Sequence, residues 1–265
     1  MSGSATDQTD IITLENVEQK FKVGDNFINV LNSANFSIKA NSFTTIFGPS
    51  GSGKSTLLNV LAGLQKPTNG KVTVMGKPLY EQNADELAHF RAKKIGFIHQ
   101  TNHWIQSLNV IENISIPLYF LGYSKLNARK LAEIALDRVK MGRYANLNPR
   151  LLSGGEQQRI AAARALANDP LFIIADEPTG NLDSENANMI MNLLVNAQTE
   201  FRRTIILVTH NLEYVPLADQ LLKIQDGYVE DIHSKDLETT VNVLLSDMMQ
   251  RIDNLSKMKK NAKKE

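Results

Sequence analysis

A glycine-rich stretch at residues 48–56, GPSGSGKST, carries the clearest chemical signal in the chain. The spacing of Gly48, Gly53, Lys54 and Ser55 is that of a phosphate-binding loop, or P-loop. Glycine adopts positive φ at little cost, so consecutive N–H groups can form a nest for phosphate oxygens. The helix expected at 55–64 aims its positive dipole end at the same anion. We predict that Lys54 neutralises the β and γ phosphates, that Ser55 holds Mg²⁺, and that nucleotide is bound by Gly48, Pro49, Ser50, Gly51, Ser52, Gly53, Lys54, Ser55 and Thr56.

Two carboxylates follow the apolar run at 171–175. Successive side chains of a strand point to opposite sides, so Asp176 and Glu177 need not share a role. We predict that Asp176 orients Mg²⁺ and that Glu177 faces the attacking water. A general base at this step is worth about 10²–10⁴ in rate. The alternative is that the two acids only end a strand at the surface.

A third motif, LLSGGEQQRIAAARAL, spans residues 151–166. Ser153 and Glu156 have the spacing of a capping box, which explains them without any ligand. A capped helix start preceded by flexible glycines is also an anion site. Since the P-loop already provides one, this second site suggests that another molecule's nucleotide is held here.

Several short apolar runs are expected to position these motifs. The runs at 171–175 and 204–208 have the character of buried parallel strands, and an amphipathic helix separates them. Further strands are expected at 11–14, 27–31, 36–38, 44–47, 71–75 and 95–98, and a helix at 85–94. This order of elements predicts an α/β core. The amphipathic helix has its apolar side at Met189, Ile190, Leu193, Leu194 and Ala197.

The segment from residue 101 to about 165 has a different character and is interpreted as a helical insertion. Its predicted helix has a stripe made of Leu131, Ile134, Ala135 and Val139. We place a flexible terminus at 1–10, the main domain at 11–230, and a separate helix with a lysine-rich tail at 231–265. That last helix has its apolar stripe at Leu237, Val241, Leu244, Met248, Ile252 and Leu255. The tail could be solvated, contact a membrane surface, or pack on a partner.

Composition excludes several classes of protein. Lys and Arg total 29 and Asp and Glu total 28, so no overall field attracts nucleic acid. No apolar run reaches the roughly 18 residues needed to span a bilayer. The chain lacks cysteine and begins with a polar stretch, which suits the cytosol.

Together, the P-loop, the Leu-Ser-Gly-Gly-Glu-Gln sequence at 152–157 and the Asp176–Glu177 pair resemble the ATPase subunits of ATP-binding-cassette (ABC) transporters. The resemblance covers about residues 11–230. It implies a P-loop NTPase core with a parallel sheet, an N-terminal antiparallel β subdomain and a helical ABC insertion. It also implies a head-to-tail dimer in which two ATP molecules with Mg²⁺ lie between the P-loop of one subunit and Ser153, Gly154, Gly155 and Glu156 of the other.

Four more residues take roles from this resemblance alone. Gln100 in GFIHQ matches the glutamine that touches Mg²⁺ or the attacking water, and Asp183 matches the loop that communicates across the dimer. His210 in ILVTH matches the histidine that contacts the γ-phosphate, and Phe21 lies where an aromatic ring stacks on adenine. Asn41 replaces a usual glycine in the turn before the P-loop strand, and its tolerance of left-handed geometry is expected to preserve that turn.

The motifs are most similar to the branch that contains macrolide exporters, lipoprotein-releasing complexes and cell-division ABC proteins. This implies an integral membrane permease subunit as partner, a homodimer or a heterodimer with a related ATPase, and a peripheral location on the cytoplasmic face of the membrane. The partner is expected to dock near Trp104, Ile105, Pro117, Leu118 and Tyr119, although a core role explains these residues equally well. Regulation of cell-wall hydrolases without transport is the alternative function. A non-hydrolysing scaffold and a soluble ABC protein acting on ribosomes or DNA are less consistent with the motifs.

Overall fold

The computed structural model describes residues 9–233, 236–237, 239–246 and 249. Residues 1–8 of the flexible terminus predicted at 1–10 lie outside this part of the chain, and so does the lysine-rich tail, whereas Asp10 already begins the first strand. Met248, Ile252 and Leu255 of the predicted C-terminal stripe also lie outside the described residues.

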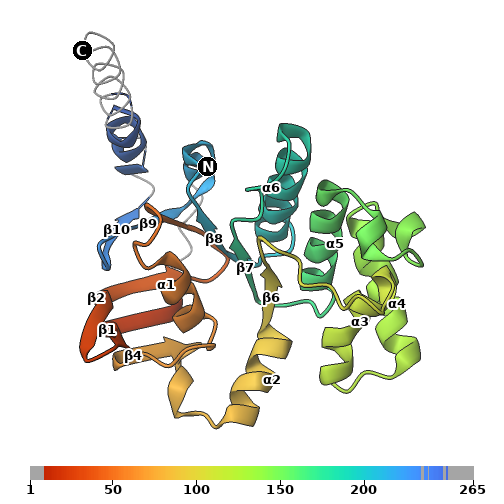
Figure 1. Cartoon of the computed structure of the whole chain (residues 1–265), viewed down its shortest axis with the longest axis horizontal. Helices are drawn as coiled ribbons and strands as arrows, with labels where there is room; N and C mark the ends of the chain where they lie inside the picture. Colours follow the sequence, from red (N-terminus) through yellow and green to blue (C-terminus); the bar gives the residue numbers. More distant parts are fainter. Residues whose placement is uncertain (1–8, 234–235, 238, 247–248, 250–265) are drawn as a thin grey trace, which may run out of the picture.

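A six-stranded sheet forms the centre of the molecule (Figure 1), in the order β10-β9-β3-β8-β7-β6. All neighbouring strands are parallel except the edge pair β9 and β10, which is antiparallel. The parallel α/β core predicted from the apolar runs is confirmed. The strands are β3 (Phe43–Phe47), β6 (Ile95–Ile98), β7 (Phe172–Asp176), β8 (Thr204–Thr209), β9 (Gln220–Gln225) and β10 (Tyr228–His233).

Two apolar clusters cover the two faces of this sheet. Ile173 and Ala175 of β7 belong to one cluster, and Phe172 and Ile174 belong to the other. Neighbours in one strand therefore point to opposite faces, both of them buried, which explains why these strands are continuous apolar runs. The helices on these faces include α1 (Lys54–Leu61), α2 (Ala84–Lys94), α5 (Gly154–Leu166) and α6 (Ser184–Thr199).

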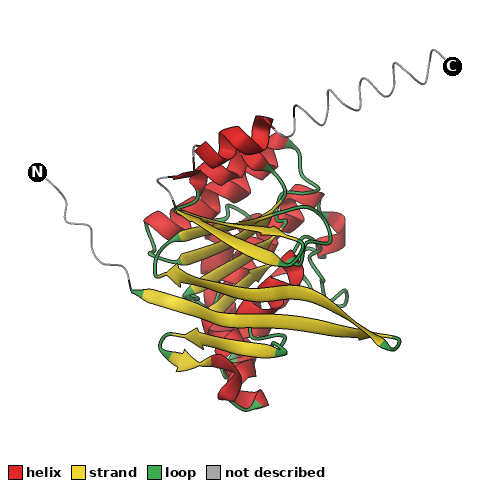
Figure 2. Ribbon diagram, turned by 90° about the vertical axis from the view of Figure 1, so that its left-hand side faces the viewer, coloured by secondary structure: helices red, strands yellow, loops and turns green. Residues whose placement is uncertain are grey.

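A second, four-stranded antiparallel sheet lies at the N-terminal side (Figure 2), in the order β2-β1-β4-β5. Its strands are β1 (Asp10–Val23), β2 (Asn26–Lys39), β4 (Asn69–Val74) and β5 (Lys77–Pro78). The three short runs expected between residues 11 and 38 are wrong in their bounds, because they join into two strands of 14 residues. Register shifts absorb the polar interruptions, where the Asn16 N–H donates to Asn35 Oδ1 at 2.8 Å.

The predicted helical insertion contains α3 (Val110–Phe120) and α4 (Lys125–Arg138) beside α5. Asn109 forms a complete capping box with Glu112 at the start of α3. In the predicted stripe of α4, Ala135 and the following Val139 are buried, and Leu131 is partly buried. Ile134 is 51% exposed, so its assignment to the packed side is wrong. Ile134 directly precedes Ala135, so it points about 100° away from that buried residue around the helix axis.

The C-terminal helix begins after β10 ends at His233, and its described residues are 236–237, 239–246 and 249. Leu237 is buried in the cluster that contains Ile173, and Val241 and Leu244 pack against that cluster. The first half of the predicted C-terminal stripe therefore packs on the chain's own core. Among the described residues, no helix combines the length and apolar character that a bilayer crossing requires.

Candidate functional site

The P-loop connects β3 to α1 and fits tightly against its surroundings. A Cβ atom on Gly48 would collide with the carbonyl oxygen of Ile224, and one on Gly53 would lie 2.7 Å from that of Val30. Gly53 is also the N-cap of α1, with φ 107°, a conformation that L side chains rarely adopt. Glycine is therefore required at both positions for steric reasons.

The polar groups of the loop are arranged to receive an anion. The Lys54 ammonium donates to the carbonyl oxygens of Gly48 and Pro49, at 2.8 Å each, so its charge lies over the loop. The Ser52 hydroxyl is buried and has no hydrogen-bond partner among the described residues. No side chain caps the first turn of α1. Phosphate oxygens would satisfy these donors, because anions bind at helix N-termini and backbone nests.

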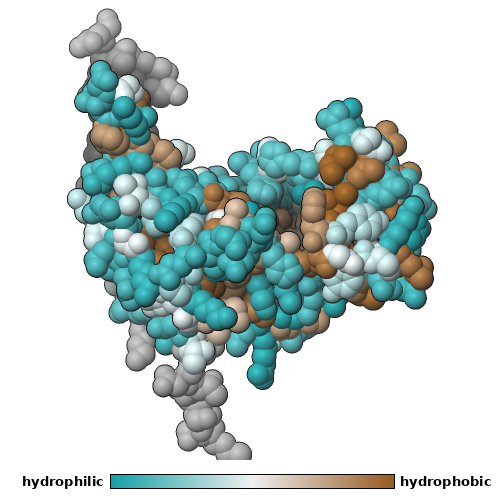
Figure 3. Space-filling view, turned by 90° about the horizontal axis from the view of Figure 1, so that it is seen from below, coloured by the Kyte–Doolittle hydropathy of each residue, from teal (hydrophilic) through white to brown (hydrophobic). Residues whose placement is uncertain are grey.

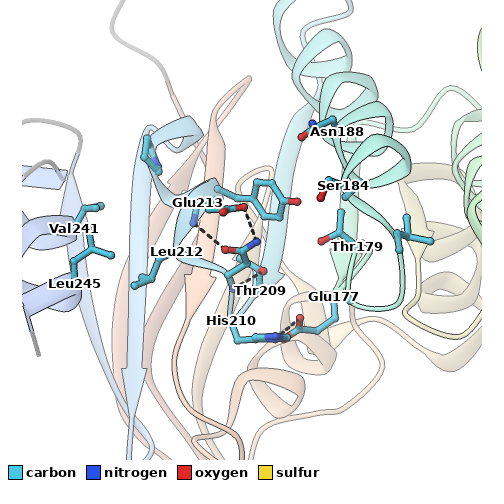
Figure 4. A pocket seen from close by; sticks show the side chains of 16 residues that line it. Glu177, Thr179, Ser184, Asn188, Thr209, His210, Leu212, Glu213, Val241 and Leu245 are labelled. Atoms are coloured by element: carbon cyan, nitrogen blue, oxygen red, sulfur yellow. Dashed lines mark hydrogen bonds and ion pairs between the residues drawn. The ribbon is translucent and has the colours of Figure 1, made fainter. Parts of the chain in front are cut away.

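Asp176 and Glu177 lie at the carboxyl end of β7, and β8 lies between β7 and β3, the strand that leads into the P-loop. Burial raises the pKa of Asp176, the neighbouring Glu177 charge raises it further, and Lys54 opposes both. Glu177 has φ 47°, which turns the chain sharply after the strand. Its Oε2 lies 2.7 Å from Nδ1 of His210, which follows the end of β8 (Figure 4). Residues predicted from separate motifs, Glu177 and His210, thus form a direct pair.

Gln100 and Asp183 flank the turn that follows Glu177. A Cβ on Gly180 would lie 3.2 Å from Gln100 Nε2, so the glutamine reaches this turn. Asp183 caps α6 by accepting from the Asn186 N–H at 2.8 Å. Hydrogen bonds from the Asn186 backbone and side chain lower the pKa of Asp183. The structure thus gathers Gln100, Glu177 and His210 at one edge of the sheet.

Ser153 and Glu156 form the predicted capping box at the start of α5. The Ser153 N–H donates to Glu156 Oε2 at 2.9 Å, and the Glu156 N–H donates to Ser153 Oγ at 3.4 Å. The Tyr144 hydroxyl donates to the other Glu156 oxygen, and this bond, followed by those from Ser153, lowers the pKa of Glu156. Ser153 and Gly154 are exposed, whereas Gly155 contacts the Asn186 side chain.

The two predicted phosphate-binding ends lie far apart within one chain. Figure 1 shows α5 and α1 on opposite sides of the parallel sheet. The P-loop and the Ser153 turn therefore do not meet at one nucleotide in a single copy.

Phe21 lies on β1 opposite Ile28 of β2 and is 38% exposed. The next part of β2 reaches the P-loop, because Val30 lies against Gly53. Phe27, at the tip of the same hairpin, is 68% exposed and is a second aromatic side chain close in sequence to this contact. Asn41 has φ 59°, so the expected left-handed turn before β3 is present.

The sequence did not reveal how α5 holds the segment after β6. The Gln158 amide donates to the carbonyl of His99 at 3.0 Å, and the Trp104 indole donates to Gln157 Oε1 at 2.8 Å. The Arg164 guanidinium lies 4.6 Å from the centre of the Trp104 ring. These contacts connect Gln100's neighbours to the helix that begins at Ser153. The run of polar residues at 156–159 did not by itself point to these partners.

The residues expected to meet a partner divide into two groups. Leu118 is fully buried in the core, and Trp104 packs against that core. Ile105 is 44% exposed and Tyr119 39%. A small pocket of about 280 Å³ lies beside Ile105 and Pro117, and its lining includes Phe97, His99, Ile116 and Arg164. Figure 3 shows apolar surface gathered on the helical side of the molecule.

Comparisons with known proteins agree with this geometry. Residues 31–180 match the family described as ABC transporter. The chain is 41% identical over 224 residues to an uncharacterized ABC transporter ATP-binding protein, MJ0796, of Methanocaldococcus jannaschii, covering 83% of this chain and 95% of the relative. It is also 41% identical over 219 residues to the macrolide export ATP-binding/permease protein MacB of Bartonella henselae, covering 83% of this chain. The match spans only 33% of that MacB protein.

Solved structures show the same fold. The dimeric post-hydrolysis MJ0796 cassette bound to ADP and Pi superposes with a TM-score of 0.79 at 39% identity, covering 84% of this chain and 99% of that one. The Clostridium perfringens protein cbiO1, described as part of the ABC transporter complex cbiONQ, has a TM-score of 0.77 at 28% identity. That alignment covers 94% of this chain and 99% of cbiO1.

Proposed function

The chain belongs to the ABC transporter family and is an ABC-type ATPase, and we propose that it drives a separate integral membrane subunit by closing and reopening as a dimer around ATP. One observation carries this proposal. Both phosphate-binding ends are well formed, yet the parallel sheet separates them within one copy. A second copy arranged head to tail would bring the Ser153 turn of each subunit to the P-loop of the other.

In the P-loop, Lys54 moves from the carbonyls of Gly48 and Pro49 to the β and γ phosphates when ATP binds. The residues present suit Mg²⁺, which commonly takes one or two carboxylates together with substrate phosphates. Asp176 would supply that carboxylate, and Ser55 and Gln100 would supply neutral oxygens. When bound, Mg²⁺ neutralises charge on the phosphates.

Glu177 acts as general base toward the water that attacks the γ-phosphate. His210 holds the Glu177 carboxylate from one side and contacts the γ-phosphate, and Gln100 aligns the water. Phe21 stacks on adenine, and Asp183 signals across the dimer from the start of α6. Dimer closure excludes water and completes each site with Ser153, Gly154, Gly155 and Glu156 of the other copy, so a single copy is nearly inactive.

The work driven by this cycle is export, extraction of lipoprotein or lipid, or mechanical transmission to the membrane subunit. Support comes from the MacB relatives, which are described as macrolide export ATP-binding/permease proteins. The exposed apolar side chains near Ile105 and Tyr119 provide the docking surface for that subunit. The chain then lies on the cytoplasmic face of the membrane as a peripheral protein, either as a homodimer or paired with a related ATPase.

The proposal is tested with the purified full chain and its Glu177→Gln variant. We expect ATP with Mg²⁺ to convert the variant from monomer to dimer in light scattering, because it binds ATP and does not hydrolyse it. We expect its hydrolysis rate to be about 10²–10⁴-fold below that of the wild type, measured with the co-purified membrane partner. Equal, negligible turnover of both proteins would contradict the assignment of Glu177.

A further inference from the structure

A pocket of about 880 Å³ lies next to the Glu177–His210 pair and is closed on one side by the C-terminal helix. In Figure 4 this pocket lies between the short helix η4 (Leu212–Leu217) and the start of α6, and Val241 and Leu245 of the C-terminal helix lie beside Leu212. The far wall includes Leu182 and Ser184, on either side of Asp183. The C-terminal helix therefore shares one concave surface with the catalytic edge of the sheet.

One side of the C-terminal helix packs against the core of the chain, and part of its exposed surface is apolar. Leu237 is 6% exposed, and Val241 and Leu244 pack on the same core. At 100° per residue, Leu245 and Met249 continue from Val241 around the helix surface, while Val243 lies nearly opposite Leu245. Leu245 is 40% exposed and Met249 is 70% exposed. The helix thus presents apolar side chains at the rim of the pocket from a fixed position.

We propose that a second copy of this chain covers this pocket, so that the C-terminal helix enlarges the ATP-dependent dimer interface beside the catalytic pair. This inference rests on the proposed dimer. The pocket is lined by Leu182 and Ser184, which flank Asp183, the residue assigned to communication across the dimer. It is also lined by His210, which is assigned to the γ-phosphate that the two copies enclose. In a two-fold dimer the same surface patch of both copies takes part in the interface, so each copy would cover the pocket of the other. A solved relative at 40% identity is dimeric.

The lack of cysteine in the sequence allows a direct test. Leu245→Cys and Val243→Cys are made separately in the Glu177→Gln background, so each protein contains a single thiol. The rate of maleimide labelling is measured with and without ATP and Mg²⁺, and light scattering records the mass in the same samples. Val243→Cys is the matched control, because Val243 is also apolar and 54% exposed on the same helix but does not line the pocket.

We expect ATP to slow labelling at position 245 by about tenfold and to leave position 243 nearly unchanged, because thiol reactivity follows exposure. Leu245→Glu should weaken the ATP-dependent dimer by a similar factor relative to Val243→Glu. A dimer that forms while both thiols label at unchanged rates would overturn this inference and leave the proposed function intact. Slow labelling at 245 without ATP would also overturn it, since the chain would then cover its own pocket. Absence of any ATP-dependent dimer would contradict the proposed function itself.

Discussion

The P-loop and the Ser153 turn are both helix starts suited to phosphate, yet they differ in how their polar groups are satisfied. The P-loop keeps the Ser52 hydroxyl buried without a partner among the described residues, and it leaves the first turn of α1 uncapped. The Ser153 turn has a complete capping box, and Tyr144 holds its glutamate. The P-loop thus has polar groups that lack hydrogen-bond partners until an anion binds, whereas those of the capping box in the Ser153 turn are satisfied without a ligand.

This difference indicates that the P-loop binds the nucleotide and that the Ser153 turn contacts a nucleotide bound by another copy. A loop with unsatisfied donors gains most when phosphate binds, because buried polar groups without partners are costly. A turn that is already satisfied can present a rigid surface to a nucleotide bound elsewhere. Changes in the P-loop should therefore abolish nucleotide binding, whereas changes in the Ser153 turn should affect assembly. Four variants or pairs of variants test this contrast.

The largest effect is expected from Gly48→Ala. Its new Cβ would collide with the backbone carbonyl of Ile224, which has no flexible side chain that can move away. Overpacking of this kind costs about 1–3 kcal/mol of stability, and we expect ATP binding to be lost. Gly154→Ala is the matched change at the other helix start, where a Cβ meets no atom within 4 Å. It should retain the fold and the ATP affinity of the monomer, as measured by calorimetry and thermal unfolding. Equal ATP affinity in the two variants would remove the contrast.

The next effect comes from Ser153→Ala, which removes a cap from α5 and the proposed contact across the dimer. Losing the cap costs about 1 kcal/mol of stability. Losing a donor to the transferred phosphate should lower ATPase activity by roughly a hundredfold while monomer binding persists. Asn109→Ala removes the equivalent capping box of α3 and is the control for the stability cost alone. If both variants lose the same activity, the Ser153 turn acts only through helix stability.

A smaller effect separates Phe21 and Phe27, two exposed aromatic side chains of the hairpin formed by β1 and β2. Base stacking on an aromatic ring is worth about 1–3 kcal/mol, so Phe21→Ala should weaken ATP binding by roughly tenfold. Phe27→Ala, on the same hairpin, should leave the ATP affinity unchanged. Fluorescence titration with ATP and with tripolyphosphate distinguishes the two, because only ATP has the base. The opposite ranking would move the adenine contact from Phe21 to Phe27.

The elements predictable from sequence were those whose cause is local. The buried runs of β7 and β8, the glycines of the P-loop and the Ser153–Glu156 spacing each carry their physical reason within a few residues. The long strands β1 and β2 were not predicted, because Asn16 and Asn35 preserve the pairing through a bulge that depends on both strands together.

Side-chain contacts between segments that are distant in the chain could also not be predicted from the sequence. The Glu177–His210 pair joins the ends of two strands, and only the resemblance to a family related them in advance. The bonds from Gln157 and Gln158 to Trp104 and His99 depend on the placement of α5 against β6. Their polar side chains gave no sign of a specific partner, since polar residues on a helix usually face water.

The smallest effect is the change in unfolding temperature with pH that the charge of Asp176 causes. Its pKa is raised above the ordinary value of 3.8, chiefly by burial, so the folded state favours the neutral acid. The associated stability is complete below the unfolded pKa and is lost as pH rises through the folded pKa. Asp176→Asn should therefore unfold at a higher temperature than the wild type at pH 7.5 without nucleotide, and the difference should shrink toward pH 4.

Asp183→Asn provides the opposite sign, because hydrogen bonds from Asn186 lower the pKa of Asp183. Its removal should reduce the unfolding temperature at neutral pH, and the loss should fade as pH falls below 3.8. Calorimetry of the two variants across this pH range measures both signs. A destabilised Asp176→Asn at neutral pH would mean that its carboxylate is already compensated. In that case no bound cation or nucleotide would be needed to offset the cost of burying the Asp176 charge.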